Sequence, residues 1–488
     1  MNRQLLIFVG SLFLASLSYL YSQQPAVRSW DGYGDHYPTS PRANRDVSNF
    51  FIFEGPGNEN TGNGLALPQD QLSIPAELKT YIARQFKYVL FDQESFCDRT
   101  KPWDQQSVRA LMTPRYHQEA QGLMSLNPSI IVLPYFCFTI IRPQYPWYGS
   151  VPESWFLHQR DKPQDAAHRV QTPEMHSYLM NISNASWRAF YVNWVDSIVH
   201  MQTYGAEEYR GIFLDNMTHY PWVTQIIYDS LPASIFNKWH EYLALFLTDL
   251  KNKVGTSRPI VCNSLGLDNG EPNTPPLYGG SHGTDVIAQM TGGALMEAFH
   301  ATAWPWVLDS TLSIMKWMRY NDKILLVGAH YTRGLDDMLS QRFGLEPSST
   351  PGWVDGMPPI STFYRMEMSY LARFLLVTPG SREFGFSYQP GVLLDQFIPY
   401  YKLWDEKIGS PIDTSYVDLG SSYKREFSRS IVYVNKSETA QLSITLPSGV
   451  ELYWFPYDTA GSQNIETVKL SAASITLNKM EGIILFKH

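Results

Sequence analysis

The sequence predicts an α/β fold, a (β/α)8 TIM barrel followed by a small all-β sandwich domain. Short apolar runs recur up to about residue 380, with spacers between them that are long enough for helices. Several runs are continuously apolar, which is typical of strands that helices cover on both faces of a parallel sheet. After about residue 413 the runs alternate between apolar and polar residues and are broken by turn residues, which indicates an antiparallel β-domain.

Eight runs are expected to form the barrel strands, because each is short, apolar and followed by polar or turn residues. In chain order they are NFFIFEG (49–55), KYVLFDQ (87–93), SIIVLPYF (129–136), GIFLDN (211–216), PIVCNS (259–264), ALMEAF (294–299), KILLVGAH (323–330) and ARFLLVTPG (372–380). Eight strands with helical spacers fit a closed barrel. An open doubly wound sheet is the alternative, but no dinucleotide-binding glycine fingerprint follows the first run.

Two spacers show the spacing of amphipathic helices. One has apolar residues at Trp187, Tyr191, Trp194, Ile198 and Met201, and the other at Ile235, Trp239, Leu243, Phe246 and Leu250. The second is expected to begin at a Ser234 cap and to stop at Gly255. The spacers 138–183 and 331–361 are rich in Pro, Trp and Gly, so we expect elaborated loops at the ends of the strands.

The N-terminus predicts export. Arg3 precedes an uncharged apolar run (5–21), which is typical of a secretory signal peptide. An uncleaved signal anchor is the alternative, because the run is at the short limit for a bilayer span and ends without small residues. We assign 1–22 to this segment, 45–410 to the barrel and 413–488 to the β-sandwich, and expect a secreted or extracytoplasmic protein that meets a membrane only through an uncleaved N-terminal segment.

The composition of the chain limits which partners and cofactors are expected. The net charge is −8 and no basic run exceeds two residues, so a nucleic-acid partner is not expected. The three cysteines, Cys97, Cys137 and Cys262, allow one disulfide at most and have no zinc-site spacing, so we expect buried thiols in strands. With no Walker loop, nucleophile elbow or H-E-x-x-H motif, we predict no cofactor and no metal.

Acidic residues follow several of the predicted strands, where the working residues of such barrels lie. They are Glu54, Asp92 with Glu94, Asp215 and Glu297, while Tyr135, Asn263 and His330 end three other runs. A carboxyl group directly after a buried strand must be hydrogen-bonded, paired with a cation or used in chemistry. A purely structural pairing is the alternative for each single acid.

Asp215 and Glu297 form the best pair for hydrolysing a glycosidic bond, which needs one carboxyl group as general acid and another as nucleophile or base. We predict Asp215 as nucleophile or base. Glu297 follows Ala294, Leu295 and Met296, and this apolar surrounding favours its protonated form and the role of acid. Retaining and inverting mechanisms both stay open.

Other residues are candidates for binding a sugar. Polar side chains at the strand ends are expected to bind hydroxyl groups, and Trp rings beyond the third and sixth runs are expected to stack on sugar faces. The predicted set is Asp92, Glu94, Tyr135, Asn216, Asn263, His330, Trp147 and Trp304. For each tryptophan, a place in the core is the alternative, and either acid of the 92–94 pair is an alternative to Asp215 in catalysis.

RGIFLDNM (210–217), GALMEAF (293–299) and the closing β-region, with its REF (425–427) and VN (434–435) motifs, carry a family resemblance. From about residue 48 to the end, the chain resembles a hypothetical family of glycoside hydrolases. The resemblance implies an exported (β/α)8 barrel with a C-terminal β-domain that acts on carbohydrate, without naming a substrate.

We therefore expect an exported glycoside hydrolase acting on a poly- or oligosaccharide. The alternative is a non-catalytic carbohydrate-binding or cell-surface protein on the same fold. A third hypothesis is a metal-dependent barrel hydrolase, such as a deacetylase or phosphodiesterase, which would require a bound metal ion.

Overall fold

The structure is a computed structural model. It describes residues 48–53, 76–91, 114–141, 145, 147–172, 177–200, 208–217, 231–263, 291–296, 312, 315, 318, 323–330, 360–378, 384–389, 408–437, 439–454 and 468–487. The predicted signal segment (1–22) and Cys97 lie outside these residues. None of the helices described is both long and apolar enough to span a bilayer.

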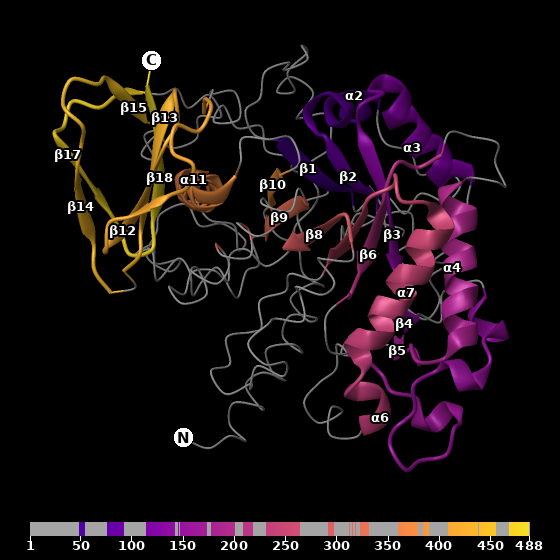
Figure 1. The fold of residues 1–488 in the computed structure, drawn as a ribbon. Coiled ribbons are helices and arrows are strands. Elements are labelled where there is room, and N and C mark those ends of the chain that lie inside the picture. Colours follow the sequence, from indigo (N-terminus) through magenta and orange to yellow (C-terminus); the bar gives the residue numbers. More distant parts are fainter. Residues whose placement is uncertain are drawn as a thin grey trace.

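Eight parallel strands form the centre of the larger part of the molecule (Figure 1). They are β1 (Ser48–Phe53), β2 (Tyr88–Phe91), β3 (Ile131–Cys137), β6 (Ile212–Asp215), β7 (Ile260–Asn263), β8 (Gly293–Met296), β9 (Ile324–His330) and β10 (Phe384–Gln389). Each pairs with the next, and β10 pairs with β1 at Ser48↔Gly385 and Asn49↔Phe386, so the strand order closes into a barrel.

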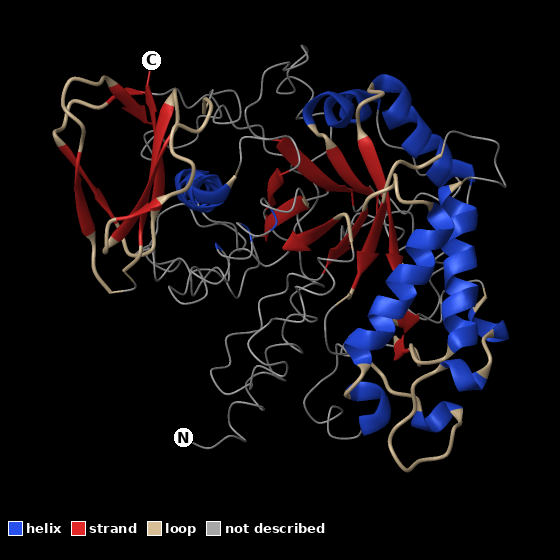
Figure 2. Cartoon of the chain, viewed as in Figure 1, coloured by secondary structure: helices blue, strands red, loops and turns tan. Residues whose placement is uncertain are grey.

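Helices lie in the spacers between these strands (Figure 2). They are α2 (Ala76–Gln85), α3 (Pro114–Leu126), α4 (Ala185–Val199), α6 (Ala233–Phe236), α7 (Trp239–Val254) and α11 (Ile360–Val377). Helices α4 and α7 pack side by side. The spacer after β7 and the chain following β10 fall outside the described residues, so a complete (β/α)8 alternation stays a prediction.

The two predicted helices exist, with differences at their ends. Helix α4 begins after Asn184, whose side chain accepts hydrogen bonds from the N–H groups of Ser186 and Trp187. The second predicted helix is divided into α6 and α7, so Ser234 lies inside α6 and is not the cap. Gly255 ends α7 with φ of 90°, a conformation that glycine adopts without strain.

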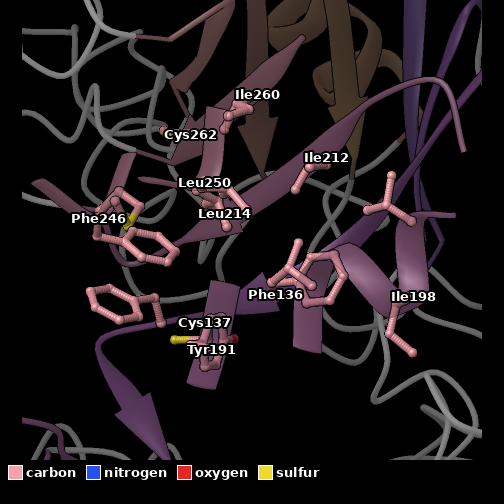
Figure 3. Packing of buried hydrophobic residues seen from close by; sticks show 14 of the residues in the cluster. Phe136, Cys137, Tyr191, Ile198, Ile212, Leu214, Phe246, Leu250, Ile260 and Cys262 are labelled. Carbon is pink, nitrogen blue, oxygen red and sulfur yellow. The ribbon is translucent and has the colours of Figure 1, made fainter. Parts of the chain in front are cut away.

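Seven of the eight predicted runs contain a barrel strand. Apolar side chains cover both faces of the sheet at β2, β3, β6 and β7. Alternate residues form a cluster inside the barrel: Tyr88, Leu90, Leu133, Phe213, Val261, Leu295 and Leu326. The residues between them face the helices, and Figure 3 shows Phe136, Ile212, Leu214, Ile260 and Cys262 together with Phe246 and Leu250 of α7. Cys137 and Cys262 are buried thiols in β3 and β7, as expected.

The predicted strand at 372–380 is wrong, because residues up to Val377 form the end of helix α11. This helix packs against β9 and β10 on one side and against strands of the C-terminal sheet on the other. Its last two turns are therefore buried all round and have the continuous apolar composition of a buried strand. The eighth strand is β10, whose sequence FGFSYQ contains no long apolar run.

The regular elements in the described residues of the predicted loop at 138–183 are short. Strands β4 (Ile140–Ile141) and β5 (Tyr178–Leu179) form a small antiparallel pair. Three single-turn helices lie between them, η7 (Tyr148–Ser150), η8 (Glu153–Trp155) and η9 (Ala166–His168). The Pro and Trp content of this segment predicts an irregular structure.

The C-terminal part is antiparallel, as predicted. Its strands are β11 (Val417–Asp418), β12 (Ser422–Glu426), β13 (Ser430–Asn435), β14 (Leu442–Thr445), β15 (Leu452–Trp454), β16 (Val468–Lys469), β17 (Ser474–Leu477) and β18 (Gly482–Lys487). Six form one sheet in the order β11-β12-β13-β18-β15-β16, and β14 pairs with β17. Residues of both sheets, including Ile431, Ile444, Leu477 and Leu485, share one core.

The other face of the six-stranded sheet packs on α11, and two buried arginines connect them. Arg425 of β12, at 0% exposure, donates through Nη1 to the carbonyl oxygens of Leu375 (2.8 Å), Leu376 (2.9 Å) and Thr378 (2.6 Å) at the end of α11. In the opposite direction, Arg373 of α11 donates to the carbonyl of Met480. We call this contact the α11 interface.

Candidate functional site

Asp215 is the last residue of β6, between the ends of β3 and β7. Because side chains alternate along a strand, Asp215 lies on the same side of β6 as Phe213, which belongs to the cluster inside the barrel. By the same alternation, Tyr135 follows Leu133 and Asn263 follows Val261 on the inner side. The structure therefore brings three residues predicted from the sequence to one place at the strand ends.

Hydrogen bonds join these residues through the carboxyl group of Asp215. The Tyr135 hydroxyl donates to Oδ2, and Asn216 Nδ2 donates to the same oxygen at 2.9 Å. Asn263 Nδ2 donates to Oδ1 at 2.8 Å. Asp215, Tyr135, Asn216 and Asn263 are all partly exposed. The partners of Asp215 among the described residues are thus neutral donors, which orient a carboxylate without neutralising it.

Trp147 packs among aromatic rings, two of which belong to α4. Its ring stacks on Tyr145 with centroids 4.9 Å apart and contacts Phe190 at 5.3 Å and Trp194 at 5.4 Å. Trp155 also contacts Phe190, at 5.3 Å. These contacts agree with the core alternative for Trp147, and its role in sugar binding stays a prediction.

The structure gives no side-chain contacts for the other residues predicted to form the site. Glu297, Asp92, Glu94, Trp304 and Glu54 lie outside the described residues. His330 is the last residue of β9. In the part of the chain that is described, no group of three or more His, Cys, Asp or Glu side chains is arranged to hold a metal ion.

A second carboxylate, Glu153, is held in a different way. Its Oε1 accepts hydrogen bonds from Arg169 Nε and His158 Nε2, both at 2.8 Å, and Oε2 pairs with Arg169 Nη2. The hydrogen bond from Arg169 is the main cause that lowers the pKa of Glu153 to about 2. The Arg169 guanidinium also lies over the Phe156 ring, 3.7 Å from its centroid. The group is a charge-paired clamp within segment 147–180.

Neither this clamp nor Thr139 is among the residues predicted from the sequence. The Thr139 hydroxyl, which is buried, donates to the carbonyl of Asn216 at 3.2 Å. The only sequence signal for Thr139 is its position two residues after β3. The clamp has no regular spacing, so no sequence pattern indicates it.

Comparison with known proteins gives one family and several distant structures. The sequence model of hypothetical glycosyl hydrolase family 15 matches residues 125–431. A search of curated proteins found no match. An α-amylase from Geobacillus thermoleovorans, complexed with acarbose, shares 11% identity at a TM-score of 0.46, covering 92% of this chain and 99% of that chain.

Two further solved structures are similarly distant. The glycoside hydrolase domain of PelA from Pseudomonas aeruginosa shares 13% identity at a TM-score of 0.33, over 62% of this chain and 91% of that one. A GH36 α-galactosidase from Geobacillus stearothermophilus shares 12% identity at a TM-score of 0.42, over 96% and 57%. Similarity at this level supports no conclusion about substrate.

Proposed function

This chain belongs to hypothetical glycosyl hydrolase family 15, and from that premise we propose that it is an exported glycoside hydrolase that cleaves a poly- or oligosaccharide. The proposal includes a complete (β/α)8 barrel within residues 45–410 and a β-sandwich within 413–488. The N-terminal apolar run supports export. The catalytic pair in this proposal is Asp215 and Glu297.

The observation that carries the proposal is the environment of Asp215. Its carboxyl group lies at the end of a barrel strand, is partly exposed and accepts hydrogen bonds from Tyr135, Asn216 and Asn263. All three neighbours are donors, so the group acts as the acceptor. This arrangement suits an unprotonated nucleophile or base better than a general acid.

The case for Glu297 as the acid comes from its position in the sequence relative to β8. Leu295 belongs to the cluster inside the barrel, and Glu297 follows two residues later. The alternation of a strand predicts the inner side for Glu297 as well. In the reaction, Glu297 protonates the leaving oxygen, while Asp215 either bonds to the anomeric carbon or takes a proton from the attacking water.

The test is hydrolysis by the purified protein of a panel of aryl glycosides and polysaccharides. Asp215→Asn and Glu297→Gln should each lower kcat by about a thousandfold or more, with thermal unfolding little changed. Asp418→Asn, which makes the same change at an exposed carboxylate of β11, is the matched control and should stay fully active.

Two outcomes contradict the proposal. Unchanged turnover in both active-site variants would remove the catalytic pair. Binding of the wild-type protein to a glycan array without release of reducing ends would instead support the non-catalytic carbohydrate-binding alternative.

A further inference from the structure

The turn that follows Asp215 has an unusual backbone and is held from two sides. Asn216 has φ of 53°, in the left-handed region that asparagine tolerates better than most residues. Its carbonyl accepts the hydrogen bond from Thr139, at 3.2 Å. The next N–H group, that of Met217, donates to the carbonyl of Asn263 at 3.1 Å. The turn is thus fixed to the chain after β3 and to the end of β7.

This turn directs the side chain of Asn216 back toward the protein. Its Nδ2 lies 2.9 Å from Asp215 Oδ2 and 3.5 Å from Cys137 Sγ. Thr139 is 2% exposed, so water competes little for the hydrogen bond that its hydroxyl makes to the Asn216 carbonyl. This bond holds the turn in place, and the turn places the Asn216 amide where it orients the carboxyl group of Asp215.

The two oxygens of Asp215 are not equally occupied. Among the described residues, Oδ2 accepts from both Tyr135 and Asn216, whereas Oδ1 accepts from Asn263 alone. Each carboxylate oxygen has two lone pairs for hydrogen bonding. Oδ2 is therefore saturated by protein donors, and one lone pair of Oδ1 is left for another partner.

We propose that Thr139 and Asn216 are positioning residues that fix the Asp215 carboxyl group with Oδ1 as the reacting oxygen. This inference rests on the proposed function. In a retaining reaction, the Oδ1 lone pair bonds to the anomeric carbon while the glycosidic C–O bond breaks and the leaving oxygen takes the proton of the general acid. In an inverting reaction, the same lone pair takes a proton from water as the water oxygen attacks that carbon, the glycosidic C–O bond breaks and the leaving oxygen takes the proton of the general acid.

Two substitutions remove the side-chain hydrogen bonds while leaving the backbone conformation of the turn possible. Asn216→Gly removes the amide but keeps a residue that adopts positive φ, so kcat should fall about 10- to 100-fold with KM little changed. Thr139→Val removes the hydroxyl at nearly constant volume and should lower kcat by about tenfold. Thr139→Ser restores the hydroxyl and should recover most of the activity. The probe is an aryl glycoside that the wild-type protein hydrolyses.

Matched controls make the same chemical changes elsewhere. Thr291, also 2% exposed, donates its hydroxyl to the Gly293 carbonyl at the start of β8, so Thr291→Val loses an equivalent hydrogen bond away from Asp215. Asp161 has φ of 60°, so Asp161→Gly replaces another left-handed residue. Both controls should keep wild-type kcat.

Crystal structures of the variants give a readout that does not depend on activity. In Asn216→Gly we expect the carboxyl group of Asp215 to turn away from its wild-type orientation. If Asp215→Asn is inactive but Asn216→Gly and Thr139→Val have wild-type kcat, the positioning inference is overturned and the proposed function stands.

If no glycoside is hydrolysed, or if Asp215→Asn is fully active, the proposed function fails. In that case the crystal structure of Asn216→Gly still tests the inference, because an unmoved Asp215 carboxyl group overturns it.

Discussion

The strand ends at Asp215 and the α11 interface both hold a charged side chain among neutral partners. The carboxylate of Asp215 accepts hydrogen bonds from a phenol and two amides, and the guanidinium of Arg425 donates to three main-chain carbonyls. Asp215 is partly exposed, whereas Arg425 is at 0% exposure. The two regions satisfy a charge in the same way, but only the first leaves it accessible.

The comparison separates a charge available for chemistry from a charge that serves structure. A buried charge must be hydrogen-bonded, and removing it leaves its former partners without hydrogen bonds. At Arg425 those partners are carbonyls of buried residues at the end of α11. At Asp215 the partners are side chains in a partly exposed site. We therefore expect substitutions at the α11 interface to affect stability and substitutions around Asp215 to affect activity.

The largest effect is expected for Arg425→Met, which removes the donor from three carbonyls at the end of α11. The free energy of unfolding should fall by about 3 to 5 kcal/mol, measured by urea denaturation. The control is Lys436→Met in the same β-domain, where a surface ion pair with Asp418 is lost and about 1 kcal/mol or less is expected. Equal losses in the two variants would mean that the Arg425 hydrogen bonds are not what stabilises the interface.

A smaller effect, on activity instead of stability, is expected for Asn263→Ala. This change removes the donor to Asp215 Oδ1, and kcat should fall about 10- to 100-fold because the carboxyl group loses one of its three constraints. The free energy of unfolding should change by about 1 kcal/mol or less, because Asn263 is partly exposed and water can take its place.

Asn127→Ala is the control for this comparison. Its amide donates to the Ala83 carbonyl of α2 and its Oδ1 accepts from the N–H and hydroxyl of Ser129. The variant therefore loses side-chain hydrogen bonds ahead of β3, on the N-terminal side of that strand, and should keep wild-type kcat. A large loss of stability without a loss of kcat in Asn263→Ala would reverse the assignment of this residue to the site.

The smallest effect is expected at Glu153, where a carboxylate is held by cations. Arg169 lowers the pKa of Glu153 from 4.5 to about 2, so the fold favours the ionised form. The stabilisation is complete above about pH 4.5 and is lost as the pH falls toward 2. Glu153 is 33% exposed and screened by solvent, so Glu153→Gln should cost about 1 kcal/mol at neutral pH.

The measurement is urea denaturation of wild type and Glu153→Gln between pH 2 and pH 7. The difference between the two should shrink below pH 4.5, and it should depend much less on pH in an Arg169→Met background. A difference that stays constant down to pH 2 would argue against the clamp as the source of this stabilisation.

Much of the barrel could be predicted because its strands are covered on both faces. Each of the first seven apolar runs contains a strand, since burial on both sides demands continuous apolar residues. A continuous apolar run wrongly predicted a strand at 372–380, because the last two turns of α11, enclosed by the barrel and the C-terminal sheet, also require continuous apolar residues. The same signal does not indicate β10, whose Gly385 and Ser387 interrupt the apolar pattern.

The candidate site was predictable in part, because the ends of parallel strands meet at one edge of a barrel. Tyr135, Asp215 and Asn263 each follow or end an apolar run, and the structure brings them together. The directions in which the side chains at the strand ends point could not be predicted from the sequence. The pattern predicts a sugar contact for Asn216, and it does not indicate that a left-handed backbone turns the Asn216 amide onto Asp215. Thr139 acts through a main-chain carbonyl, which leaves no pattern in the sequence.

The α11 interface has a consequence for the timing of folding. Helix α11 belongs to the barrel, but the residues that cover its outer side and bond to its last carbonyls come from strands that begin at Ser422 and end at Lys487. A chain emerging from the ribosome therefore exposes the apolar last two turns of α11 until these strands have been made. A premature stop within β18 would leave this part of α11 uncovered and the truncated chain prone to aggregation and proteolysis.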